Sequence, residues 1–289
     1  MIDNNFAVFI LTFGRPDNIK TYKTLDRFGY TGKKYLICST DDKKLDEYKS
    51  KYKDEVISFN KDDIEFDTAD NFDDKRVVVY ARNACFDIAK KLGITYFLQM
   101  DDDYTDFSYR FDDKLYYNQG RGYINNVDDI FIALLKFYKS IPAKSIAMSQ
   151  NGDWIGGDQS GMAKKLTLKR KCMNSFFCST ERPFKFMGTI NEDVNIYTRL
   201  GSVGDLFFTI PNVSLKQTDT QSNKGGMSDI YEASGTYIKS FYSVLFSPSS
   251  VKVSVLNTEN ARLHHRVSWN NAVPKILNEK YKKWTKVDT

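Results

Sequence analysis

Short apolar runs alternate with segments of helical periodicity along the first half of the chain. Each run is rich in branched and aromatic residues and has the length of one buried strand, whereas the segments between runs place apolar residues on one helical face. Strands that alternate with helices favour a mainly parallel sheet with helices on its faces. The expected strands are 7–12, 35–39, 56–59 and 94–100, and the expected helices are 17–25, 43–52, 79–92 and 128–140.

After Pro142 the pattern changes to short strands separated by loops. We expect these strands at 145–149, 174–178 and 251–256, followed by a basic C-terminal helix. The polar segment 218–229, which contains Gly225-Gly226, has a length often used for a mobile lid.

Composition and cysteine spacing indicate a cytoplasmic globular protein. The 289 residues are 27% charged and 41% hydrophobic, and no apolar stretch approaches the roughly 18 to 20 residues of a membrane span. The N-terminus has no secretory signal pattern, and the four cysteines lack the spacing of a zinc site. Cys38 and Cys85 fall in apolar patterns typical of reduced core cysteines. The net charge of +5 permits a polyanionic partner without requiring one.

Three consecutive acids, Asp101-Asp102-Asp103, follow the apolar run 94–100. Ligands in open α/β sheets collect at the carboxyl ends of such strands. Because side chains alternate along an extended chain, Asp101 and Asp103 can face the same way and Asp102 the opposite way. Oxygen ligands of this kind suit Mg²⁺ or Mn²⁺, which commonly hold substrate phosphates. The alternative is an exposed acidic turn after a strand.

Further motifs stand in order along the chain around these acids: Thr12-Phe13-Gly14-Arg15-Pro16, Ala81-Arg82-Asn83, Asn191-Glu192-Asp193 and His264-His265. With the Asp-x-Asp at the end of a strand, the set resembles the metal-dependent GT-A glycosyltransferases over about residues 7 to 270. The resemblance implies a GT-A-like, Rossmann-related α/β fold with a mixed, mainly parallel sheet flanked by helices. It also implies a nucleotide-sugar donor.

Residues 188–195, 224–227 and 235–240 are similar to a narrower group, the TET/JBP-associated glycosyltransferases of phages, which are related to the base J glucosyltransferases. That similarity implies transfer of a sugar from a UDP-sugar to a hydroxymethylated pyrimidine in double-stranded DNA, with inversion. It implies one catalytic domain over 1–289, with a nucleotide-sugar-binding half at about 1–125 and an acceptor-binding half at about 126–289. The alternative is a GT-A enzyme with a glycan, lipid or protein acceptor.

The resemblance assigns the donor site to the acids and to residues near the strand ends. Asp103 is the preferred ligand of Mn²⁺ or Mg²⁺, with Asp101 on the ribose or at a second metal position. The histidine pair follows a predicted strand, and one imidazole, preferably that of His265 rather than His264, would complete the metal site. A structural role is the alternative for both histidines. The other expected donor contacts are Thr12, Arg15, Asp41, Asp42, Arg82, Asp102 and Trp154. The alternative for Arg15 and Arg82 is a surface or helix-cap role, and Trp154 could line the sugar or the acceptor pocket.

Asp193 is the candidate general base that takes the proton from the acceptor hydroxyl, and Glu192 is the neighbour that could exchange roles with it. The alternative is that Asn191, Glu192 and Asp193 cap a helix N-terminus, and the two roles are compatible.

A basic cluster is the candidate contact for DNA phosphates, with a solvated surface as its alternative. The residues alone do not decide whether the base is flipped out. The chain also permits a non-enzymatic nucleotide or nucleic-acid binding module, whereas a metal-free glycoside hydrolase fits less well. The basic cluster consists of Lys164, Lys165, Lys169, Arg170 and Lys171.

Overall fold

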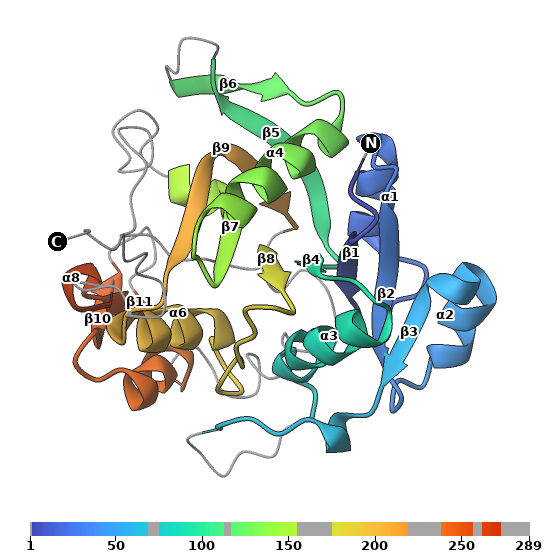
Figure 1. The fold of residues 1–289 in the computed structure, drawn as a ribbon. Coiled ribbons are helices and arrows are strands. Elements are labelled where there is room, and N and C mark those ends of the chain that lie inside the picture. The colour runs from blue at the N-terminus through green and yellow to red at the C-terminus, as the bar shows by residue number, and fades with distance from the viewer. Residues whose placement is uncertain are drawn as a thin grey trace, which may run out of the picture.

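The computed structural model describes residues 2–68, 75–112, 117–154, 175–218, 238–256 and 262–272. Its centre is a nine-stranded sheet in the order β3-β2-β1-β4-β8-β7-β9-β5-β6 (Figure 1). All strands of this sheet except β5 and β8 run in the same direction. The strands are β1 (Phe6–Leu11), β2 (Lys33–Ser39), β3 (Val56–Phe59), β4 (Tyr96–Asp101), β5 (Tyr104–Phe111), β6 (Tyr117–Tyr123), β7 (Ser145–Gln150), β8 (Ser175–Ser179) and β9 (Phe207–Gln217). A separate two-stranded sheet pairs β10 (Val251–Leu256) with β11 (Arg262–Val267).

Helices cover both faces of the nine-stranded sheet. The helices of the described residues are α1 (Lys20–Arg27), α2 (Leu45–Tyr52), α3 (Val79–Lys91), α4 (Val127–Ser140), α6 (Glu192–Ser202), α8 (Trp269–Ala272) and a further helix at 238–246. Short 3-10 turns are η1 (Lys53–Glu55), η2 (Lys61–Asp63) and η3 (Asn151–Trp154). In the described residues no helix is both long enough and apolar enough to cross a bilayer.

Successive side chains of β1 point to opposite faces of the sheet and so belong to two different cores. Phe6, Val8 and Ile10 join a core with residues of α1 and α4, whereas Ala7 and Phe9 join a second core with residues of α3 and α6. Every residue of β1 is buried, as expected of a strand covered on both sides.

The strand order reverses between β1 and β4. The chain leaves β1 through α1 toward β2 and β3, and then returns to β4 through α3 on the opposite face. Leu11 at the end of β1 lies opposite Asp101 at the end of β4. A crevice at such a switch point is the usual ligand position in open α/β sheets, and both the loop after β1 and the three acids begin there.

The structure confirms the predicted fold class, a mixed and mainly parallel α/β sheet flanked by helices. The expected strands and helices are present with small shifts at their ends. The helix expected from residue 17 begins at Lys20, because Asn18 N donates to Arg15 O at 3.0 Å in a turn. The pattern did not predict β5, β6 or β9. The expected lid lies outside the described residues except for Thr218, and most of the expected basic C-terminal helix lies outside them too.

Candidate functional site

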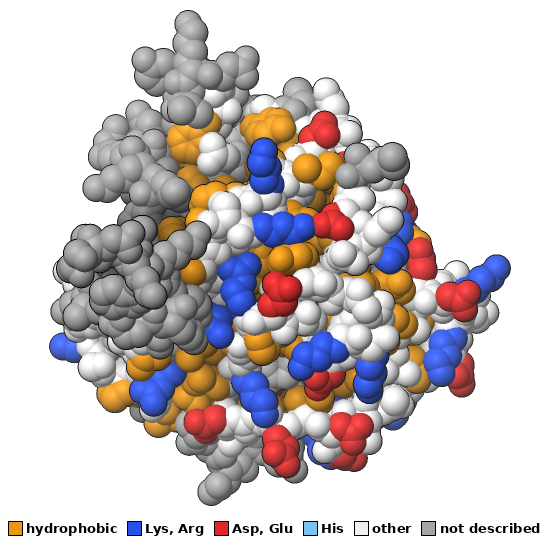
Figure 2. Space-filling model, in the orientation of Figure 1, with side chains coloured by type: hydrophobic (Ala, Val, Ile, Leu, Met, Phe, Trp, Pro, Cys, Tyr) orange, Lys and Arg blue, Asp and Glu red, His pale blue; other side chains and the backbone are white. Residues whose placement is uncertain are grey.

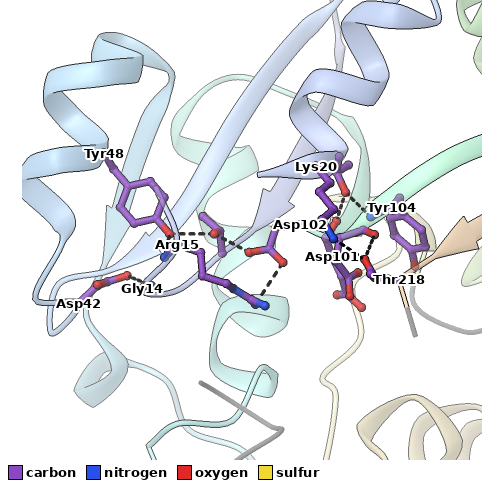
Figure 3. A network of polar contacts seen from close by, with 12 residues as sticks. Gly14, Arg15, Lys20, Asp42, Tyr48, Asp101, Asp102, Tyr104 and Thr218 are labelled. Atoms are coloured by element: carbon purple, nitrogen blue, oxygen red, sulfur yellow. Dashed lines mark hydrogen bonds and ion pairs between the residues drawn. The ribbon is translucent and has the colours of Figure 1, made fainter. Parts of the chain in front are cut away.

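The loop after β1 holds Asp102. Thr12 Oγ1 donates to Asp102 Oδ2 at 2.7 Å, and Arg15 Nη2 lies 3.1 Å from Asp102 Oδ1. Figure 3 shows the Asp102 side chain directed toward Arg15. Asp102 and Thr12 are buried, with 2% and 7% of their surfaces exposed, whereas the Arg15 side chain is 27% exposed. The middle acid is therefore bound from inside the protein by Thr12 and from the surface by Arg15.

Two side chains from the β2–α2 region fix the same loop. The Tyr48 hydroxyl accepts from Arg15 N at 2.7 Å and lies 2.9 Å from Thr12 Oγ1. Asp42 Oδ2 accepts from the backbone N–H of Gly14 at 2.6 Å, and Gly14 has a positive φ of 72°. Asp41 instead pairs with Lys61 at 3.0 Å and has a half-exposed side chain. Of the two acids expected near the donor, Asp42 is therefore the one that contacts the loop.

Arg82 of α3 joins the end of β4 to the start of α6. Its Nη2 donates to Asp101 Oδ1 at 3.0 Å, and its Nε donates to Glu192 Oε1 at 2.8 Å. These partners are 19 and 110 residues away from Arg82 in the sequence. The fold thus brings together the strand that carries the three acids and the helix that carries the predicted catalytic pair.

Asp193 lies beside this ion-pair network. Its Oδ1 accepts from Val194 N at 2.8 Å, and its negative charge contributes to raising the pKa of both Asp101 and Glu192. Asn191 does not cap α6 through its side chain, which was one of the predicted roles of this motif. It has a left-handed φ of 55°, and its amide donates to Lys239 O at 2.7 Å and Ser243 Oγ at 3.1 Å in the helix at 238–246. The entry to α6 is therefore attached to a neighbouring helix.

Asp103 faces a different set of neighbours. Its backbone carbonyl accepts from Thr218 N at 3.2 Å and Thr218 Oγ1 at 2.9 Å, and Lys20 Nζ donates to the same hydroxyl at 3.3 Å (Figure 3). Its side chain bonds to Gln217. The Asp103 Oδ1 atom is buried and has no hydrogen-bond partner in the described part of the chain.

The acids concentrate negative charge in a buried region. Burial raises the pKa of Asp101, Asp102 and Asp103 to about 6, although Arg82 and Arg15 oppose the rise. Burial also raises the pKa of Glu192. Because these carboxylates and Asp193 outnumber the two neighbouring guanidinium groups of Arg15 and Arg82, the region favours a cation.

Among the acids at the end of β4, Asp103 is the candidate ligand for a hard divalent cation. The unpartnered Asp103 Oδ1 is an oxygen ligand without a donor, and carboxylate oxygens are the ligands that Mg²⁺ and Mn²⁺ prefer. Within the described residues no group of three or more His, Cys, Asp or Glu side chains is already arranged around one point.

The predicted histidine ligands lie on β11, outside the large sheet. The His264 and His265 rings are 4.3 Å apart, and His265 is buried opposite Val253 of β10. Their part in metal binding stays a prediction.

Trp154, predicted to line the donor or acceptor pocket, is 5% exposed. Its Nε1 donates to Ser149 Oγ at 3.1 Å, and its ring packs beside Arg110 and Phe111.

The basic cluster of residues 164–171 lies outside the described residues. On the face shown in Figure 2, the described basic and acidic side chains are interspersed rather than gathered into one basic patch.

Sequence reasoning missed residues that hold the site together. The sequence pattern places Tyr48 within an expected helix and Asn83 within a motif, and it gives no indication of the role of Tyr242. Asn83 exchanges two hydrogen bonds with the backbone of Phe186, at 3.0 and 2.8 Å. Tyr48 is the one buried residue of α2, which the polar sequence of this helix does not indicate.

The family model described as TET-Associated Glycosyltransferase matches residues 6–226, which include the loop after β1, Arg82, the three acids and the Glu192-Asp193 pair. The chain belongs to the TET-associated glycosyltransferase family. Membership confirms the enzyme class that the motifs predicted, a glycosyltransferase. Comparison with curated proteins gave no match.

Solved structures with distant similarity to this TET-associated glycosyltransferase include a 1–349 fragment of Staphylococcus aureus TarS, with 13% identity and a TM-score of 0.42 over 78% of this chain and 62% of that one. Glucosyl-3-phosphoglycerate synthase from Mycobacterium tuberculosis, solved with Mn²⁺, UDP and phosphoglyceric acid, has 11% identity and a TM-score of 0.43 over 91% and 86%. Mannosyltransferase PcManGT from Pyrobaculum calidifontis, solved with GDP-Man and Mn²⁺, has 11% identity and a TM-score of 0.46 over 75% and 59%. The chain thus spans less than two thirds of the TarS fragment and of the mannosyltransferase.

Proposed function

We propose that this protein transfers a sugar from a nucleotide-sugar, with a UDP-sugar as first choice, to a hydroxymethylated pyrimidine in double-stranded DNA. Membership of the TET-associated glycosyltransferase family supports a DNA acceptor. The observation that carries the proposal is the convergence of Asp101 and Glu192 on Arg82 at the switch point of the sheet. This contact joins a donor-binding strand end to a helix that begins with a carboxylate pair.

Asp193 is proposed as the general base. Glu192 is held by Arg82, whereas in the described part of the chain the hydrogen bond of Asp193 is the one that its Oδ1 accepts from Val194 N. The second carboxylate oxygen of Asp193 is proposed to accept the proton of the acceptor hydroxyl. Removing the hydroxyl proton as the oxygen attacks the anomeric carbon supports direct displacement, so we expect inversion at that carbon. The nucleoside diphosphate leaves from the opposite face of the sugar. Thr12, Arg15 and Asp102, which are linked to one another, are proposed to form one wall of the nucleotide site.

Asp103, with Asp101, is proposed to hold Mn²⁺ or Mg²⁺. When bound there, the cation would neutralise charge that develops on the leaving diphosphate. Asp103 Oδ1 supports this assignment because it is buried and has no other partner in the described part of the chain. His265, or His264 in its place, remains the proposed additional ligand.

The function is tested by incubating the protein with Mn²⁺, several UDP-sugars and DNA duplexes that contain 5-hydroxymethylcytosine, 5-hydroxymethyluracil or unmodified bases. Mass spectrometry of the DNA should show one added glycosyl residue only on a hydroxymethylated duplex. If the donor is consumed and transfer occurs only to a glycan, lipid or protein, the acceptor is wrong and the enzyme class stands. If a UDP-sugar binds but is neither transferred nor hydrolysed, the chain is a binding module.

Variants test the assigned residues in the same assay. Asp103→Ala should lower the rate on the order of 100-fold because a cation ligand is lost. Asp193→Asn should lower it by roughly 100- to 10,000-fold because the base is lost. The matched control is Asp87→Ala, which removes an exposed acid of α3 that pairs only weakly with Lys90 and should keep the wild-type rate. Full activity of Asp103→Ala with Mn²⁺ would contradict the mechanism.

A further inference from the structure

We infer that Arg82 is a positioning residue that fixes the separation between Asp101 on the donor side and the catalytic start of α6. This inference rests on the proposed function and adds to it a residue that would act through its partners rather than on the substrate. The sequence alone predicts either direct contact of Arg82 with the donor or a surface or helix-cap role.

The surroundings of Arg82 leave its guanidinium little freedom. The residue is 1% exposed, and its guanidinium carbon lies 5.1 Å from the Phe176 ring centre and 5.7 Å from that of Phe186. Gln99 of β4 donates to the Arg82 carbonyl at 2.9 Å. Rings that lie over a guanidinium stabilise its charge and restrict its rotation.

The two ion pairs use different nitrogens of one planar group. Nε donates to Glu192 and Nη2 donates to Asp101, so the fixed geometry of the guanidinium sets where each carboxylate lies. Asp101 and Glu192 carry like charges in a buried region, and they would repel each other if the Arg82 guanidinium were not between them. A lysine would supply the charge as a single point and cannot hold both carboxylates at set angles.

Arg82 would affect catalysis by setting the position of the proposed base relative to the donor. Asp101 belongs to the strand end where the donor is proposed to bind, and Glu192 precedes the proposed base Asp193 in α6. Arg82 therefore keeps the proposed base and the bound donor in register. Because a misplacement of about 1 Å can cost on the order of 100-fold in rate, losing this link should slow the reaction more than it weakens donor binding.

The test compares Arg82→Lys with the wild type for UDP affinity in Mn²⁺, kcat for sugar transfer and thermal stability. We expect kcat to fall on the order of 100-fold while the Kd for UDP changes by less than about threefold. A double-mutant cycle then adds Glu192→Gln. The two substitutions should be strongly non-additive in kcat, because each breaks the same link.

The matched control cycle uses Thr198→Val on the same helix. Thr198 is buried, and its hydroxyl bonds to Val194 O, Asn195 O and Ser247 Oγ rather than to either carboxylate. Its effect should therefore add to that of Arg82→Lys. Near-normal kcat in Arg82→Lys, or additivity with Glu192→Gln, would overturn the inference.

A folding failure of Arg82→Lys leaves Glu192→Gln alone as the deciding variant. This variant should lose kcat with UDP affinity preserved, and full kcat would overturn the inference. A wild-type protein that turns over no nucleotide-sugar would overturn the proposed function and this role of Arg82 together. An active wild type with an active, folded Arg82→Lys variant would overturn only the role of Arg82.

Discussion

Asp101, Asp102 and Asp103 are adjacent in the chain but have separate partners. Asp101 pairs with Arg82, Asp102 is held by Thr12 and Arg15, and Asp103 bonds to Gln217. All are raised in pKa by burial, so each is a less stable anion than an exposed carboxylate. In the metal-free protein, burying these three charges lowers the free energy of unfolding. The same charges favour the binding of a cation.

Replacing Asp103 by Asn should stabilise the metal-free protein near neutral pH. The pKa of Asp103 is about 6 when folded and near 3.8 when exposed, so the folded state binds a proton that the unfolded chain has already lost. Stability from this residue is therefore highest below about pH 4 and falls as the pH rises through 6. We expect Asp103→Asn to raise Tm in EDTA by about 2–4 °C at pH 7.5 and to give little gain at about pH 4.

The control for this prediction is Asp87→Asn, since Asp87 is exposed on α3 and carries no buried charge. An equal gain in both variants, or a gain at acid pH only, would contradict the account of Asp103.

At the scale of elements, the loop before α6 is fastened by the helix at 238–246. The Tyr242 hydroxyl accepts from Thr189 N and lies 2.9 Å from Thr189 Oγ1, and it donates to Thr68 O at 2.6 Å. Gly188 has a φ of 82°, and a Cβ there would lie 2.8 Å from the Tyr242 ring. One phenol therefore joins three chain segments next to the proposed base.

Tyr242→Phe should destabilise the protein by about 1–3 kcal/mol, because buried groups that bond to the hydroxyl lose their partner. Urea unfolding measures the difference. The control Tyr109→Phe removes a hydroxyl from a partly exposed residue of β5 and should change the free energy of unfolding by less than about 0.5 kcal/mol. Equal effects of the two substitutions would show that the Tyr242 contacts contribute nothing.

Elements with an unbroken period could be predicted from the sequence, and those with irregular pairing could not. β3 was predicted with its exact bounds, and α4 places Ile130, Leu134 and Tyr138 inward as expected. β5 and β9 were missed because their ladders shift register, between Tyr104 and Asp106 and between Met148 and Ser149. A bulge breaks the alternation of faces on which strand prediction depends.

The candidate site also contains residues that the sequence pattern predicts and residues that it does not. The three acids are visible because they follow a clean apolar strand. The links of Arg82 to Asp101 and Glu192, and of Tyr242 to Thr189, join residues from distant elements that no local pattern connects.

At the scale of the whole molecule, the switch point places the site between two structural regions. The parallel strands β3, β2, β1 and β4 form the proposed donor side. The proposed base lies on α6, which is attached to the helix at 238–246. The nine-stranded sheet contains strands from both sequence halves, 1–125 and 126–289. The division of binding roles between these halves remains a proposal.

The strand order also determines whether fragments of the chain can fold independently. β5 and β6 precede residue 125 but pair beyond β9, so β8, β7 and β9 from the second half are inserted between them and β4. Fragments 1–125 and 126–289 should each be insoluble alone, and a tag on one should recover both after co-expression. Independent folding of either fragment would contradict this expectation. A nick at residue 125 would then leave two interleaved chains that separate only when the sheet itself opens.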